Sequence, residues 1–95
     1  MIPKNSFPTA LRILRKSRGL SQEAFSEVSS RTYMSSLERG LKNPTLSKVD
    51  ELCEVMEVHP LTLLALAYGL DAKGADKVLT RVQRELAALQ DGQGA

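Results

Sequence analysis

The apolar residues of this chain recur every three or four positions, with polar residues between them, over most of its length. This spacing is typical of amphipathic α-helices. Glycines and prolines interrupt it and mark where helices end. The pattern predicts helices at residues 8–18, 22–27, 31–39, 46–56, 60–68 and 75–90. We therefore expect an all-α protein with a compact five-helix domain at residues 1–70, followed by a linker and a C-terminal amphipathic helix at 71–95.

Polar residues stand where helices need caps. Ser21 and Thr45 precede the second and fourth predicted helices, and their side-chain oxygens can accept a bond from a backbone N–H of the first turn. Either Ser29 or Ser30 can cap the third. His59 precedes the fifth, where a lone histidine is a cap or loop residue rather than a metal ligand.

The same spacing predicts which side of each helix is buried. Met34 and Leu37 share the inward face of the third predicted helix. Its outer side then carries Thr32, Ser35, Ser36 and Arg39. The fourth predicted helix has an apolar series that begins at Leu46. The fifth turns Leu61, Leu64, Ala65 and Tyr68 inward. The last helix, before a fraying end at residues 91–95, carries a heptad-like stripe of Ala75, Leu79, Val82, Leu86 and Leu89.

Composition excludes several classes of protein. A single cysteine, Cys53, and a single histidine leave no disulfide framework and no multi-cysteine metal site. No nucleophile, base and orienting acid can be recognised, so we expect no enzyme activity, no cofactor and no metal. No small-molecule effector is evident. Without a secretory signal or an apolar run long enough to span a bilayer, we expect a cytoplasmic protein with no membrane partner.

Charge is unevenly distributed although the net charge is only +2. Residues 1–42 contain eight Lys and Arg against three Glu, whereas residues 43–70 contain one Lys against four acidic residues. Residues 71–95 are balanced. A basic first half suits a partner that carries phosphates. A solvated basic surface with no partner fits the same distribution equally well.

Residues 21–40 combine two short predicted helices, a tight turn and a basic flank, which together predict a helix-turn-helix. The second helix of such a motif lies in the major groove, so its first turns need side chains that hydrogen-bond to bases. The side chains that meet this need are Arg31, Thr32, Ser35 and Ser36. Gln22 and the free N–H groups beside it can contact the DNA backbone.

Residues from Leu11 to about Ala67 resemble the Cro/C1-type (XRE-like) helix-turn-helix family. The resemblance is carried by Gly19-Leu20-Ser21-Gln22, Phe25, Arg31-Thr32-Tyr33-Met34-Ser35, Leu37-Glu38-Arg39-Gly40 and Pro44-Thr45-Leu46. It implies a lambda-repressor-like fold and binding to double-stranded DNA. It also implies that Arg15 and Glu38 form an ion pair that links the first helix to the third.

The resemblance further implies roles for individual residues. Gln22 matches a position that contacts the DNA backbone and often a base. The positions that read bases are matched by Arg31, Thr32 and Ser36, and those that face phosphates by Tyr33, Arg39, Lys42 and Asn43. Ser30 and Ser35 complete the candidate DNA-binding set. Alternatives stay open: Arg31, Thr32 and Ser36 can be plain surface residues, and Tyr33 can pack on the fourth helix.

One departure from the family pattern concerns the turn before the third helix. The stretch between Phe25 and Tyr33 is about two residues shorter than the family usually has. Either the second helix ends early or the turn is compact.

Partners follow from the size of the motif, because one recognition helix reads only a few base pairs. We expect a homodimer that represses transcription from a palindromic operator. The candidate dimerisation residues are Leu79, Val82, Leu86 and Leu89, and the Tyr68–Leu70 segment can join them. Two alternatives are open: the stripe folds back on its own domain, or the fold serves as a protein-interaction adaptor or an antitoxin-type module.

Overall fold

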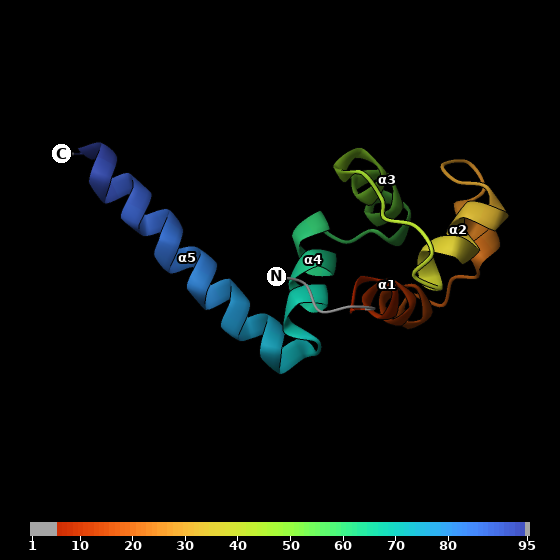
Figure 1. Ribbon diagram of the computed structural model, residues 1–95, viewed down its shortest axis with the longest axis horizontal. Coiled ribbons are helices and arrows are strands. Elements are labelled where there is room, and N and C mark those ends of the chain that lie inside the picture. Colours follow the sequence, from red (N-terminus) through yellow and green to blue (C-terminus); the bar gives the residue numbers. More distant parts are fainter. Residues whose placement is uncertain (1–5, 95) are drawn as a thin grey trace.

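The structure is a computed structural model, and it describes residues 6–94. Within that range the chain is all-α, with five α-helices and one 3-10 helix (Figure 1). The elements are α1 (Ser6–Ser17), η1 (Gln22–Phe25), α2 (Arg31–Glu38), α3 (Leu46–Met56), α4 (Pro60–Gly69) and α5 (Ala72–Gly94). The predicted fold class is confirmed.

The core forms where α1, η1, α2, α3 and α4 meet. Its largest fully buried side chains are Phe25, Leu11, Met34, Leu37, Leu52, Met56, Leu63 and Cys53. Met34 and Leu37 are inward, as their spacing predicts. Burial of each large apolar side chain contributes about 1.5–3 kcal/mol, so this core fixes the five elements relative to one another.

Thr45 and His59 cap their helices through side-chain bonds, whereas the Ser21 side chain makes no cap bond at the start of η1. Gly19 follows α1 with a φ of 71°, a conformation that costs glycine little. Thr45 Oγ1 accepts a bond of 3.1 Å from the Lys48 N–H. His59 Nδ1 accepts one of 3.0 Å from the Leu61 N–H, so this histidine is a helix cap.

Two predictions about buried faces are wrong. In α4 the buried residues are Leu63, Ala65 and Ala67, whereas Leu61 and Tyr68 are exposed. Almost every position of α4 is apolar, so spacing alone cannot orient this helix. Leu46 is also exposed, because it is the first residue of α3 and lies beyond the edge of the core.

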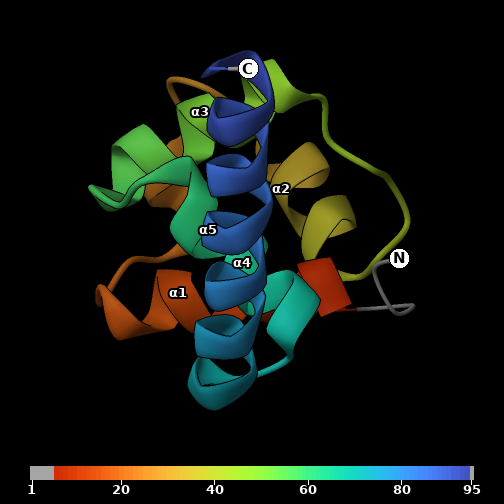
Figure 2. The same ribbon diagram turned by 90° about the vertical axis from the view of Figure 1, so that its left-hand side faces the viewer.

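Helix α5 projects away from the other helices (Figure 1). The whole molecule, with α5 included, measures 50 × 23 × 23 Å along its principal axes. Figure 2 shows α5 standing in front of the other helices when the molecule is viewed from that side. The helix is longer than predicted at both ends and includes residues 91–94, whereas Ala95 lies outside the described residues. Every residue from Leu79 to Gly92 is exposed.

A tight elbow joins α4 to α5. Leu70 takes a left-handed conformation with a φ of 72°, and the Asp71 carboxylate accepts a bond of 2.7 Å from the Gly74 N–H. Gly69 and Gly74 approach so closely that a Cβ on either would overlap the backbone of the other. Two glycines therefore allow the contact that sets the direction of α5.

Candidate nucleic-acid interface

The helix before α2 is short, and the turn that leads into α2 spans residues 26–30. The predicted helix at 22–27 is a single 3-10 turn that ends at Phe25, so the second helix does end early. Ser30 is the N-cap of α2: its side chain accepts a bond of 3.0 Å from the Tyr33 N–H. Ser29 instead donates to the carbonyl of Ser30. The short spacing between Phe25 and Tyr33 thus shortens the second helix, and α2 still begins at Arg31.

A nearly buried ion pair ties α1 to α2. Arg15 Nε and Nη2 lie 2.5 and 2.9 Å from the two carboxylate oxygens of Glu38, and the side chains are 11% and 5% exposed. The hydrogen bond to Glu38 raises the pKa of the Arg15 guanidinium, while burial lowers it. Arg15 also donates to the Leu20 carbonyl, and Gln22 donates to Glu38 at 3.2 Å. The structure therefore contains the ion pair that the resemblance implies.

Five candidate DNA-binding residues line one recess on the outer side of η1 and α2. This polar recess has a volume of about 410 Å³ and is lined by Gln22, Arg31, Thr32, Ser35 and Arg39. Its walls are thus two guanidinium groups, two hydroxyls and an amide. Such groups donate and accept hydrogen bonds in the patterns that base edges present in the major groove.

The other candidates lie elsewhere. Ser36 is only 7% exposed, against the expectation that it faces outward, because α2 packs against both α1 and η1. Tyr33 is half-buried and packs against the core. Lys42 and Asn43 are exposed on the loop after α2.

Lys48 of α3 holds this region together, a role that nothing in the sequence indicates. Its ammonium group donates to the carbonyl of Val28, in the turn before α2, and forms an ion pair of 3.0 Å with Glu51. It also lies 5.8 Å from the centre of the Tyr33 ring, which Lys42 approaches to 5.7 Å. Lys48 therefore fixes the turn and the start of α2 against α3.

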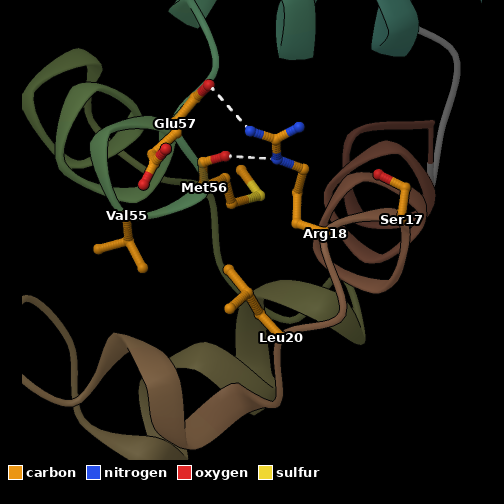
Figure 3. A pocket seen from close by; sticks show the side chains of 6 residues that line it. All are labelled: Ser17, Arg18, Leu20, Val55, Met56 and Glu57. Carbon is orange, nitrogen blue, oxygen red and sulfur yellow. Dashed lines mark hydrogen bonds between the residues drawn. The ribbon is translucent and has the colours of Figure 1, made fainter.

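The basic residues of the first half divide between internal contacts and the surface. Arg18 Nε donates to the Met56 carbonyl at 2.8 Å, and Nη2 donates to that of Glu57 at 3.4 Å (Figure 3). These carbonyls end α3, so Arg18 satisfies acceptors that lack helical partners. It lines a separate hollow of about 350 Å³. Lys4 lies outside the described residues. The exposed cations of the first half that lie on or next to α2 are Arg31, Arg39 and Lys42.

Glu23 and Arg31 form an ion pair that sequence analysis missed. Glu23 Oε1 lies 3.2 Å from Arg31 Nη1, and the two side chains are 69% and 77% exposed. They are eight positions apart and on different elements, so only the angle between η1 and α2 brings them together. No helical or strand spacing predicts such a contact.

Neither metal nor thiol chemistry is indicated at this surface. Among the described residues, no group of three or more His, Cys, Asp or Glu side chains could hold a metal ion. Cys53 is fully buried in the core, and its burial raises the pKa of the thiol to about 11. The surface is suited to non-covalent recognition through charge and hydrogen bonds.

Comparison with known proteins gives one match. Residues 11–63, which are more than half of the chain, match the model of the helix-turn-helix family. The matched segment begins in α1 and ends in α4, so it contains both partners of the Arg15–Glu38 pair and all residues of the polar recess. No match was found among curated proteins or among solved structures.

Proposed function

The chain belongs to the Cro/C1-type, XRE-like helix-turn-helix family and thus carries a DNA-binding domain, and we propose that it is a sequence-specific transcriptional repressor that acts as a homodimer on a palindromic operator. In this proposal residues 1–70 are the DNA-binding domain and residues 71–95 the dimerisation arm. DNA-binding domains of this kind are typical of regulators that catalyse no reaction. No helix among the described residues is long and apolar enough to cross a membrane, and we propose a cytoplasmic location.

The polar recess is the observation that supports sequence-specific binding. Arg31 stands at the start of α2, the part of a recognition helix that reaches base edges. Thr32, Ser35 and Arg39 extend the same surface along α2, and Gln22 approaches it from η1. We propose that Arg31, Thr32, Ser35 and Gln22 read bases, and that Arg39, Lys42 and Asn43 contact phosphates. Ser30, which caps α2, contributes its position rather than a direct contact, and buried Ser36 is a weaker candidate.

DNA binding and its surface are tested by salt titration. Affinity for duplex DNA is expected to fall steeply between about 50 and 200 mM salt. Arg39→Ala should weaken binding to all sequences and reduce the salt slope by about one, whereas Thr32→Ala should change the preferred sequence more than the affinity for random DNA. A selection from random duplexes supplies the site. Arg12→Ala, on the exposed side of α1, is the matched control.

The exposed stripe of α5 supports the proposed homodimer. Leu79, Val82, Leu86 and Leu89 are 38–62% exposed, so the alternative that they fold back on their own domain is not seen in this structure. Tyr68 and Leu70 are exposed near the elbow. A contiguous apolar stripe at heptad spacing is what a helix presents to a partner helix. We propose that a second copy of the chain covers it.

The solution mass tests the dimer. The wild-type chain is expected to have twice the mass of one chain at micromolar concentration, and Leu86→Glu is expected to give the single-chain mass. Ala88→Glu introduces the same charge on the opposite side of α5 and should leave the dimer intact. A wild-type mass that equals one chain would contradict the proposal. The adaptor or antitoxin alternative has less support, because the outer side of α2 is polar and basic.

A further inference from the structure

The ion pair between Glu23 and Arg31 places a carboxylate at the surface that we propose contacts DNA. The inference drawn from it rests on the proposed function. Arg31 lines the polar recess and begins α2, while Glu23 approaches it from η1 at 3.2 Å. Both side chains are mostly exposed, so each is free to meet DNA or solvent.

A carboxylate at such a surface is unfavourable for binding in general, because DNA phosphates repel it. The neighbouring acid of α2, Glu38, is nearly buried and satisfied by Arg15 and Gln22, so it presents little charge to DNA. Glu23 is different. Its side chain is exposed, and among the described residues the contact that the structure gives this side chain is the ion pair with Arg31.

We infer that Glu23 is a specificity-determining residue. Its ion pair with Arg31 disfavours contacts of Arg31 with the phosphates of random DNA, and the pair breaks when Arg31 binds a guanine at the correct site. An exposed ion pair of this kind is weak. Two hydrogen bonds from one guanidinium to guanine O6 and N7 are therefore enough to replace it. A phosphate contact gains less, because it brings a second negative charge close to the Glu23 carboxylate. Glu23 thus lowers the affinity for random DNA more than the affinity for the correct site.

The test compares two duplexes with the full-length chain. One duplex is selected from a random pool by the wild-type protein, and the other has the same composition in scrambled order. Glu23→Gln should raise the affinity for the scrambled duplex by about 3- to 10-fold at low salt and steepen its salt slope by up to about one. Affinity for the selected duplex should rise less, so the ratio of the two affinities should fall.

Two variants separate this role from a general effect of charge. Glu27→Gln removes the same charge from an exposed position four residues along, which has no ion pair with any residue that the structure describes, and should change both affinities by a similar factor. In an Arg31→Ala background, Glu23→Gln should leave the affinity ratio unchanged. Far-UV circular dichroism and the unfolding midpoint show that each variant is folded.

Three results would overturn the inference. The first is a ratio of the two affinities that changes no more in Glu23→Gln than in Glu27→Gln. The second is a change of this ratio by Glu23→Gln that persists in the Arg31→Ala background. The third is a loss of affinity for the selected duplex alone in Glu23→Gln, which would show that Glu23 itself contacts a base. If the wild-type protein bound neither duplex in a salt-dependent way, the proposed function would fail, and the inference with it.

Discussion

The contribution of single residues is clearest at the Arg15–Glu38 pair, where two charges are taken out of solvent and satisfied by each other. Glu38 accepts from both Arg15 and Gln22, and Arg15 also bonds the Leu20 carbonyl. Such a pair is not in itself strongly stabilising, but the loss of one partner leaves the other charge buried and unpaired.

Replacing Arg15 should therefore destabilise the fold. Arg15→Met is expected to lower the free energy of unfolding by about 3 kcal/mol, because Glu38 would keep little access to water. Urea denaturation followed by circular dichroism measures the change. Arg12→Met, three residues earlier and exposed, should stay within about 0.5 kcal/mol of wild type. Equal losses in the two variants would show that the pair is not the cause.

Cys53 gives a prediction about pH. Its thiol has a pKa raised from 9.0 to about 11, mainly by burial, so the folded state keeps the proton at pH values where the unfolded state loses it. The contribution of the Cys53 thiol to the free energy of unfolding is therefore fully present below pH 9. As the pH rises to 11, the free energy of unfolding falls by about 2–3 kcal/mol in total. Comparing wild type with Cys53→Ala in denaturant titrations from pH 8 to 11 isolates this contribution from other groups. A constant difference between the two proteins would refute it.

At the residue scale, the sequence predicts contacts between residues close together in the chain better than contacts that depend on how the helices pack. The Thr45 cap follows from residues three apart, and Met34 and Leu37 follow from helical spacing. The burial of Ser36 does not, because it depends on how α2 packs against α1 and η1. The contact of Lys48 with Val28 likewise needs the packing of α3 on the turn before α2.

At the scale of elements, the path from η1 to α2 decides where the candidate base-reading residues stand. The early end of η1 at Phe25 takes up the short spacing, so Ser30 still caps α2 and Arg31 still begins it. The sequence revealed that the spacing was short, but two solutions fitted it. The choice depends on where Phe25 enters the core, which is a tertiary contact.

The cap of α2 can be tested directly against its neighbour. Ser30→Ala should lower the free energy of unfolding by about 1 kcal/mol, because the Tyr33 N–H loses its acceptor. Ser29→Ala removes the same hydroxyl from a residue that does not cap α2 and should cost clearly less. Thermal or urea unfolding of the two variants measures the difference. The reverse order would show that Ser29 is the cap in solution.

At the scale of the whole molecule, the elbow between α4 and α5 separates a compact DNA-binding head from an exposed arm (Figure 1). The sequence predicted a C-terminal helix that carries an apolar stripe, and the structure has a helix there. The sequence did not predict that α5 begins at Ala72 or that its direction depends on Gly69 meeting Gly74. Loop-like residues such as Asp71 and Gly74 indicated a linker, whereas Asp71 bonds the first turn of the helix.

Substitution at the elbow should move the arm. Gly69→Ala places a methyl group where the backbone of Gly74 and Ala75 lies, so α5 must shift, at a cost of about 1–3 kcal/mol. Small-angle X-ray scattering should show a changed shape, and urea unfolding a lower stability. Gly92→Ala is the control, since nothing lies within 4 Å of the added atom, and it should stabilise α5 slightly. Unchanged scattering in Gly69→Ala would contradict this role of the elbow.

Because α5 is one continuous helix from the elbow to the apolar stripe, the direction in which the stripe faces is fixed relative to α2. Each residue of a helix turns the next side chain by about 100°. One extra residue between Ala75 and Leu79 would therefore rotate the stripe by about 100° and turn the two heads of the proposed dimer away from a shared face of DNA. Seven extra residues would return it to within about 20° of its original direction. In the proposed dimer, the length of the first two turns of α5 would therefore set the angle between the two DNA-binding heads.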